Sequence, residues 1–306
     1  MQRFLIAGLL ALAGTAASAT MLDLSRYTTS TSFALDRLDA LGGMGLEASA
    51  VTYARDRGSL FFVGDEGLGV VEISLTGQTL GSMRFSWAGT GSTNNDAEGL
   101  TYLGNGQMLV VEERLQRAYA FSFEAGATAA LGSAPSAVIS TWVPSNIGIE
   151  GISVDPRDGS VVTVKQDADG NPNRGPQEVR AGMLDFGGST PLPVLFDANL
   201  LGLDSLTDVQ VLSVVDALAG TAAADHLLIL SLDSRRIVEV TRSGQIVSSL
   251  DISGLTSTQA IEGMTIDEHG VIYLVAEHQQ GFGAPADAAS RLFVLAPVTA
   301  PVPEPG

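Results

Sequence analysis

The sequence predicts an all-β chain folded as a single five-bladed β-propeller, and two observations lead to that prediction. A short motif, in which one polar residue stands just before an apolar strand, occurs five times. These polar residues, called the anchors below, are Ser49, Glu98, Glu150, Thr207 and Glu262, at intervals of 49, 52, 57 and 55 residues. Repeats of this length are typical of propellers and solenoids. Glycine is plentiful, at 35 of 306 residues, and the apolar runs are short, as expected of many short strands joined by tight turns.

Each repeat is predicted to form four strands. We expect them at residues 50–53, 60–63, 70–74 and 79–85 in the first repeat, at 100–102, 108–111, 118–123 and 138–142 in the second, and at 209–214, 226–230, 236–240 and 245–250 in the fourth. Turn residues such as Gly104-Asn105-Gly106 separate the strands. The fourth repeat also carries an alanine-rich insertion, residues 216–225, which we expect to be a surface loop.

The fifth repeat supplies only three strands, at residues 264–267, 271–275 and 291–295, before a proline-rich tail begins. Residues 22–38 precede the first anchor and contain a strand-like piece at 31–35. We expect this N-terminal strand to become the outer strand of the last blade. Such closure joins the two ends of the chain and removes exposed strand edges. A six-bladed ring is the alternative, and it would need a further repeat.

Both ends of the chain resemble export and sorting signals. Residues 1–19 are predicted to be a signal peptide, with Arg3, an apolar run over 4–13 and the cleavage site Ala17-Ser18-Ala19; an uncleaved membrane anchor is the alternative. Residues 20–296 would then form the propeller, and 297–306 a tail. In that tail Val302-Pro303-Glu304-Pro305 resembles the start of a PEP-CTERM sorting signal, whose apolar helix and arginine cluster do not follow here. We therefore expect an exported protein of the periplasm, cell envelope or extracellular space of a Gram-negative bacterium.

The composition excludes some classes of partner. The formal net charge is −18, from 34 acidic and 16 basic residues, which repels nucleic acid and attracts cations. No cysteine is present, so an exported chain of this kind must be stable without disulfides. We expect a monomer with no nucleic-acid partner and no transmembrane helix in the mature chain. Its partner is expected to be a small ligand or an envelope component of unknown identity.

The anchors form one of two polar columns that point to a site. Counting from the start of the second strand of each repeat places a second polar residue at the strand's far end: Asp65, Glu113, Gln166, Asp233 and Glu277. The first and second strands of a blade are antiparallel, so the start of one lies beside the end of the other. Both columns should therefore surround the same mouth of the central channel, with Glu112 and Lys165 beside them.

Oxygen ligands of this kind favour a hard cation. Carboxylates that converge on a partly dehydrated mouth either take up protons or are neutralised by a cation. Carboxylate, hydroxyl and amide ligands suit calcium better than zinc. The alternative for each carboxylate is a structural role, as an acceptor for backbone N–H groups of the next blade. Asp167-Ala168-Asp169-Gly170-Asn171 resembles part of a calcium loop but lacks the later glutamate, and we interpret it as a turn.

Three functions remain open from the residues. The first is a binding module that holds calcium at the mouth and presents that face to a ligand. The second is a calcium-dependent hydrolase of the lactonase or phosphoesterase kind, with Glu113, Glu277 or His278 as the base. The third is a purely structural propeller. Whether the chain is an enzyme is left undecided, with a binding role favoured.

The repeats also resemble a known family. The matching segments are residues 47–53, 65–66, 70–77, 96–100, 111–114, 149–152, 164–166, 232–235, 260–263 and 276–277. They are similar to the SdiA-regulated family, the YjiK-like β-propellers of the bacterial cell envelope. The resemblance implies a fold and a compartment, and no reaction. Gln166 stands where the family usually has an acid, and Thr207-Asp208 where it has Ser-Gly, so blades three and four are expected to contribute less to a site.

Overall fold

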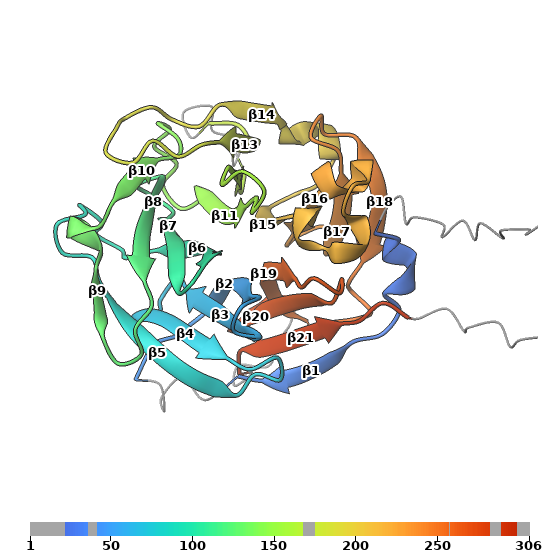
Figure 1. Cartoon of the computed structure of the whole chain (residues 1–306), viewed down its shortest axis with the longest axis horizontal. Coiled ribbons are helices and arrows are strands. Elements are labelled where there is room, and N and C mark those ends of the chain that lie inside the picture. Colours follow the sequence, from blue (N-terminus) through green and yellow to red (C-terminus); the bar gives the residue numbers. More distant parts are fainter. Residues whose placement is uncertain (1–21, 36–41, 168–174, 257, 282–288, 299–306) are drawn as a thin grey trace, which may run out of the picture.

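Five sheets are arranged as blades around a central axis, which confirms the five-bladed β-propeller and makes the six-bladed alternative wrong (Figure 1). The structure is a computed structural model that describes residues 22–35, 42–167, 175–256, 258–281 and 289–298, without the side chains of 278–281. The residues predicted to form a signal peptide and those that resemble a PEP-CTERM motif lie outside the described residues. Among the residues that are described, none belongs to a helix with the length and hydropathy to cross a bilayer.

Each blade is an antiparallel sheet whose first strand is innermost. Blade one contains β2 (Ala48–Ala54), β3 (Ser59–Gly64), β4 (Gly69–Ile73) and β5 (Thr79–Ser86), and blade two contains β6 (Ala97–Gly104), β7 (Gln107–Glu112), β8 (Arg117–Ser122) and β10 (Ser136–Val138). Blade three contains β11 (Ile149–Val154), β12 (Val161–Lys165), β13 (Glu178–Gly182) and β14 (Val194–Asp197), and blade four contains β15 (Leu206–Val211), β16 (Leu227–Ser231), β17 (Arg236–Val240) and β18 (Ile246–Asp251). Blade five contains β19 (Gln259–Ile266), β20 (Ile272–Gly281), β21 (Arg291–Leu295) and β1 (Thr31–Ala34).

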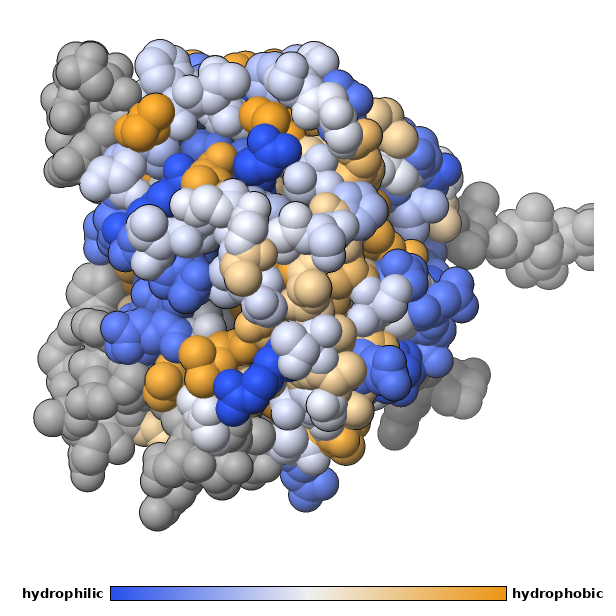
Figure 2. All heavy atoms as spheres, turned by 90° about the vertical axis from the view of Figure 1, so that its left-hand side faces the viewer, coloured by the Kyte–Doolittle hydropathy of each residue, from blue (hydrophilic) through white to orange (hydrophobic). Residues whose placement is uncertain are grey.

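The burial of a strand follows its distance from the axis. Strands β3 and β16 are buried along their whole length because a neighbouring blade covers each of their faces. They are accordingly continuous apolar runs, as in sheets covered on both sides. The outer strands β5 and β18 mix buried and exposed residues. On the side of the ring seen in Figure 2, hydrophilic residues cover most of the surface and hydrophobic ones are scattered among them.

Some details of the strands differ from the sequence prediction; residues 212–214, for example, were expected in a strand and form a 3-10 helix. The fourth strand of blade two, expected at 138–142, is β10 at Ser136–Val138. The connection that leads to it also contributes β9 (Thr128–Ala130), which pairs in parallel with β5 and extends blade one. A three-residue strand in a connecting segment has no periodicity of its own, so its pairing depends on the neighbouring blade.

The insertion at 216–225 is not the open surface loop that was expected. It forms two 3-10 helices, Asp216–Leu218 and Ala222–Asp225, directly after a third at Leu212–Val214. Leu218 and Ala223 are buried in the same hydrophobic cluster as residues of blades four and five. The alanines that suggested a loop are small enough to pack closely against the ends of these blades.

The chain closes the ring as predicted. Strand β1 pairs antiparallel with β21, so that Ser32 faces Phe293 in the register. Before β1, Leu24 and Tyr27 are buried in the cluster between blades four and five, and the Tyr27 hydroxyl donates to the Gly270 carbonyl. The outer strand of the last blade therefore comes from the start of the chain (Figure 1).

Removal of residues 22–35 is expected to open the ring and cause aggregation. The deletion exposes the backbone of β21 as a free edge and uncovers the apolar cluster beneath Leu24 and Tyr27. Size-exclusion chromatography and circular dichroism would test this. Deletion of 299–306, which takes part in none of the described strand pairings, is the control and should leave a monodisperse protein. A monodisperse, fully folded 22–35 deletion would contradict the role of β1.

A ring of side-chain hydrogen bonds joins the five innermost strands. Its members, called the hydroxyl ring below, are the residues three positions after each anchor: Thr52, Thr101, Ser153, Gln210 and Thr265. The bonds run from Tyr102 N to Thr52 Oγ1 (3.0 Å), Val154 N to Thr101 Oγ1 (3.1 Å), Val211 N to Ser153 Oγ (3.2 Å), Thr265 Oγ1 to Gln210 Oε1 (3.1 Å) and Tyr53 N to Thr265 Oγ1 (3.2 Å). Each blade thus satisfies a polar group of the next, so buried backbone N–H groups are paired. The sequence contains this third column, although only the structure shows its purpose.

Candidate cation site at one mouth of the propeller

The anchors share a backbone feature, because each is the extra residue of a β-bulge. The pairing between the first and second strands shifts in register at the anchor in all five blades. A bulge leaves its extra residue without a partner on the neighbouring strand and re-aims the side chain. The repeated motif therefore has a structural meaning: it marks the start of each innermost strand and turns one polar side chain out of the ladder.

Glycine follows the three glutamate anchors because the next blade lies too close for a side chain. A Cβ atom on Gly151 would lie 2.6 Å from the Asp208 Cα atom, and one on Gly263 would lie 2.8 Å from the Ala50 Cα atom. A Cβ on Gly99 would lie 2.9 Å from the Glu150 carbonyl oxygen. The Glu-Gly pair thus combines an inward carboxylate with close contact between blades.

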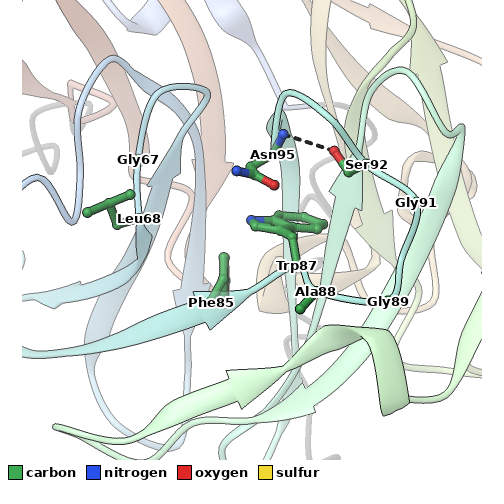
Figure 3. A pocket seen from close by; sticks show the side chains of 9 residues that line it. All are labelled: Gly67, Leu68, Phe85, Trp87, Ala88, Gly89, Gly91, Ser92 and Asn95. Carbon is green, nitrogen blue, oxygen red and sulfur yellow. Dashed lines mark hydrogen bonds between the residues drawn. The ribbon is translucent and has the colours of Figure 1, made fainter.

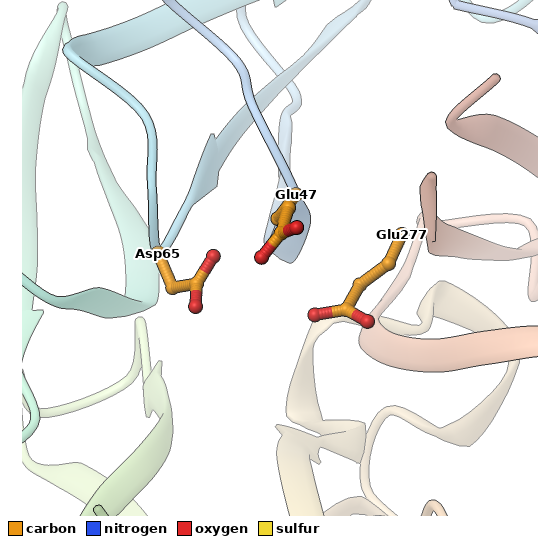
Figure 4. A group of neighbouring side chains, drawn as sticks. All are labelled: Glu47, Asp65 and Glu277. Carbon is orange, nitrogen blue, oxygen red and sulfur yellow. The ribbon is translucent and has the colours of Figure 1, made fainter. Parts of the chain in front are cut away.

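The anchors and the strand ends bring carboxyl groups together at this mouth. Glu47, Asp65 and Glu277 have carboxylate oxygens within 4.8 Å of one another, and so do Asp65, Asp96 and Glu98. Figure 4 shows the first three side chains pointing toward a common space. Asp65 belongs to both groups. The set that interacts electrostatically, called the acidic mouth below, is Glu47, Asp65, Asp96, Glu98, Glu113, Glu150, Glu262 and Glu277.

Two members of the acidic mouth, Glu47 and Asp96, were missed in the sequence. Each stands two residues before an anchor, where the other three blades have Gly148, Ser205 and Ala260. The Glu47 and Asp96 carbonyls accept hydrogen bonds from the N–H groups of Asp65 and Glu113, at 3.2 and 3.0 Å. The backbone itself therefore holds the missed residues beside the predicted ones. Counting backward from the anchors would have found both acids.

Asp233, which was placed in the second column, does not join the acidic mouth. Tyr102 in blade two and Val211 in blade four stand at the same distance after their anchors, and they pair with Met108 and Leu227. Counting the same distance along the second strand, from Met108 to Glu113 and from Leu227 onward, leads to Leu232 as the equivalent of Glu113. The N–H of Leu232 accordingly donates to the Ser205 carbonyl. Asp233 lies one residue further on and is exposed. The insertion in blade four moved the start of the second strand by one position, and a one-residue slip sends a side chain to the other face.

Burial and mutual repulsion raise the pKa values of these carboxyls. For Glu98, Glu150 and Glu262 burial is the largest cause and neighbouring carboxylates add to it, which holds each pKa well above the usual range. Burial, then Glu47, raises the pKa of Asp65 to about 8. For Glu113 burial, opposed by a hydrogen bond from the Gly148 N–H and reinforced by Asp96, raises the pKa to about 8.

Glu277 completes the set. Burial and the charge of Glu47 raise its pKa to about 7, while a hydrogen bond with the Glu262 side chain opposes that rise. Two adjacent carboxyls that share a hydrogen bond cannot both be ionised at low cost. Without a cation, burial and mutual repulsion therefore favour the protonated form of these carboxyls.

Few positive groups oppose this charge among the described residues. Arg114 donates to Asp96 at 2.5 Å and lies 3.6 Å from Glu113. Lys165, fully buried, donates to the Asp167 carbonyl, and burial lowers its pKa to about 8. Glu112, expected beside the columns, is bonded instead to the Ser92 hydroxyl and the Leu115 N–H.

The remaining predicted residues have more local roles. The Ser49 hydroxyl donates to the Glu47 carbonyl and accepts from the Asp65 N–H, so it supports two acids of the mouth. Gln166 donates to the Ser205 hydroxyl at 3.2 Å. Thr207 is buried, and its Oγ1 has no hydrogen-bond partner among the described residues. The side chain of His278 and residues 168–171 of the calcium-loop-like segment lie outside the described part of the chain.

A pocket of about 640 Å³ shares its loops with the acidic mouth. Gly67 and Leu68 follow Asp65 closely, and Asn95 directly precedes Asp96. Trp87 and Phe85 form the apolar part of this pocket, opposite Leu68 (Figure 3). The Trp87 Nε1 atom is buried and has no hydrogen-bond partner among the residues described. An apolar surface thus lies next to the carboxylates.

A family model described as SdiA-regulated matches residues 24–281, which span most of the chain. The chain belongs to the SdiA-regulated family. Several solved structures are similar to this chain at low identity. A luciferin-regenerating enzyme is 10% identical with a TM-score of 0.49, and the match covers 87% of this chain and 95% of that one. A streptogramin B lyase is 12% identical with a TM-score of 0.42 over 80% of this chain and 65% of that one. A nidogen/laminin complex is 13% identical with a TM-score of 0.45 over 75% and 72%.

In this SdiA-regulated propeller, blade four replaces the glycine after its anchor by Asp208. Its carboxylate is buried and accepts hydrogen bonds from the N–H groups of Met264 and Val209, both at 2.7 Å. Burial raises the Asp208 pKa well above the usual range. Asp208 therefore joins blade four to blade five, in the structural role that was the alternative for every carboxylate of the motif.

Proposed function

We propose that this exported SdiA-regulated propeller is a binding module that holds a divalent cation, calcium, at its acidic mouth. The observation that supports this most directly is the presence of two sets of three acidic side chains, both of which include Asp65. Within each set, the carboxylate oxygens lie within 4.8 Å of one another. Calcium binds oxygen ligands at about 2.4 Å, so two ligands of one ion are at most about 4.8 Å apart. Glu47, Asp65 and Glu277, with Asp96 and Glu98 beside them, match that donor chemistry.

The cation would neutralise charge that the protein leaves uncompensated. Six carboxyls of the mouth have raised pKa values from burial and mutual repulsion, and Arg114 is ion-paired with two acids of the mouth, Asp96 and Glu113. A bound divalent cation reverses that effect by favouring the ionised carboxylates. The adjacent pocket of Trp87 and Phe85 gives the same face an apolar surface for a ligand.

Metal analysis and calorimetry test the proposal. The mature protein, stripped with chelator and dialysed, should bind calcium with a measurable heat. Asp65→Asn should weaken calcium binding by about 10-fold or more, because it removes a charged ligand that belongs to both sets of acids. Asp233→Asn is the matched control, since Asp233 is an exposed acid outside the mouth, and it should leave the affinity unchanged. Absence of calcium binding, or equal loss in the two variants, would contradict the proposal and favour a structural role for the acids.

A hydrolytic activity is the second candidate, and Glu277 favours it. Its carboxyl lies beside those of Glu47 and Asp65, so a general base at this position would stand next to a bound ion. A calcium-dependent hydrolase would polarise a carbonyl or phosphoryl oxygen at the ion. A panel of lactones, esters and phosphoesters, assayed with calcium and with chelator, would detect it. Turnover that Glu277→Gln does not reduce would exclude Glu277 as the base.

A further inference from the structure

A second cavity occupies the opposite end of the propeller. Its volume is about 880 Å³, and it lies where the innermost strands end. The residues that line it come from all five blades and include the whole hydroxyl ring. The hydroxyl ring therefore separates this cavity, called the funnel below, from the acidic mouth, because the ring residues stand three positions after the anchors. The acidic site does not account for the funnel.

The floor of the funnel holds unused hydrogen-bond donors. Thr52, Thr101 and Ser153 are buried, and each of these hydroxyls accepts a hydrogen bond from a backbone N–H of the next blade. None of the three donates its own O–H to any acceptor among the described residues, whereas Thr265 donates to Gln210. A hydroxyl has one donor as well as its acceptor sites. Three O–H donors at the bottom of one cavity are thus free for an acceptor on a ligand.

The walls of the funnel are mostly apolar, and the positive charge at its rim is already paired with an acid. Side chains that could cover the body of a ligand are Tyr53, Tyr102, Leu103, Val154, Val214 and Ile266. Arg55 is the basic residue of the lining, and both of its terminal nitrogens already bind the Asp216 carboxylate, at 2.9 and 3.0 Å. Asp56 and Glu268 are acids of the rim, and the acidic mouth lies beyond the floor. An anion would therefore be repelled from both directions.

We propose that the funnel binds an uncharged small molecule with an apolar body and a carbonyl-type acceptor at the end that enters first. The acceptor would meet the O–H groups of Thr52, Thr101 and Ser153, and the body would lie against the tyrosine and aliphatic wall. Apolar walls with a few convergent polar groups at the base are typical of ligand sites, and this volume is in their usual range. This site is independent of the cation site.

Nile red is a suitable probe because it is uncharged, has an apolar ring system and carries one carbonyl. It should bind the whole protein saturably with blue-shifted fluorescence. Leu103→Asp should weaken binding by about 10-fold or more, since it places a charge on the apolar wall at a residue that is already 43% exposed. Leu80→Asp, at another exposed leucine outside the funnel, and Leu68→Asp, in the pocket of Trp87, are matched controls that should bind normally. Normal binding by Leu103→Asp, or loss in Leu68→Asp, would overturn the proposal.

The floor and the charge selectivity are tested separately. Thr101→Val removes the O–H but keeps the shape, so Nile red affinity should fall by roughly 3-fold to 10-fold, as for one hydrogen bond, while Thr101→Ser should retain it. Circular dichroism must show that the valine variant is folded, because it also loses the bond from Val154 N. The anionic dye anilinonaphthalene sulfonate should bind the funnel more weakly than Nile red, and chelator should change neither affinity. Any of three results would contradict the site as described. These are equal losses of Nile red affinity in Thr101→Val and Thr101→Ser, tighter binding of the anionic dye than of Nile red, and loss of Nile red binding in chelator.

Discussion

In chelator, the protein is expected to lose thermal stability as the pH rises from about 4 to about 8. The pKa values of Asp65 and Glu113 are raised to about 8 and that of Glu277 to about 7 in the folded state. In the unfolded chain these groups return to ordinary values near 4. Between these pH values the folded state therefore holds protons that the unfolded state has already released. The stability that these three carboxyls contribute is fully present below their unfolded pKa values, and it is lost as the pH rises through their folded pKa values.

Calcium is expected to reverse that loss. Bound cation favours the ionised carboxylates, so its effect on the melting temperature should be large at about pH 8 and small at about pH 5. We expect an increase of roughly 10 °C at the higher pH, because a few kcal/mol of free energy of unfolding shift the melting temperature of a chain this size by that amount. Differential scanning calorimetry across the pH range, with calcium and with chelator, measures both effects.

Replacing Glu98 and Glu262 together by glutamine provides the control for that experiment. Glutamine resembles the protonated carboxyl, so the double variant should be more stable than the natural protein in chelator at about pH 8. It should also show little response to calcium, because two buried carboxylates of the mouth are gone. A double variant whose pH profile and calcium response match those of the natural protein would show that Glu98 and Glu262 do not set either property.

Gly151→Ala is expected to destabilise the protein strongly. Its Cβ would lie 2.6 Å from the Asp208 Cα and Oδ1 atoms, and 2.9 Å from the backbone nitrogen of Val209. Backbone cannot rotate aside as a flexible side chain does, so blades three and four must separate. We expect a loss of about 3 kcal/mol or more in the free energy of unfolding, measured by urea denaturation.

Gly254→Ala is the matched control, because nothing lies within 4 Å of a Cβ at that position and its φ is not in the left-handed region. It should leave stability unchanged or raise it slightly, since alanine restricts the unfolded chain. Equal stability of the two variants would mean that the contact between blades at Gly151 is looser than described. A loss in Gly151→Ala alone would show that the glycine after the anchor is required for packing between blades.

The candidate site was only partly predictable from the sequence. The anchors were found because a repeat recurs in register along the chain, and Glu98, Glu150 and Glu262 do lie together. Glu47 and Asp96 escaped notice because only two blades carry an acid at that position. Asp233 was misplaced because the insertion before Leu227 hides where the second strand begins, and only pairing with Val211 defines it.

Sequence alone predicted the five blades and their innermost strands, because both depend on local periodicity that repeats along the chain. It also predicted closure by the N-terminal strand, because the fifth repeat lacks a fourth strand of its own. Tertiary structure decided what each polar residue of the repeat does. Glu98 and Asp208 occupy neighbouring positions of the same motif, yet one joins a group of carboxylates and the other bonds to the backbone of the next blade. The difference arises from contacts between different blades, because Asp208 bonds to Met264 of blade five and Glu98 of blade two lies beside Asp65 of blade one. No local pattern in the sequence records these contacts.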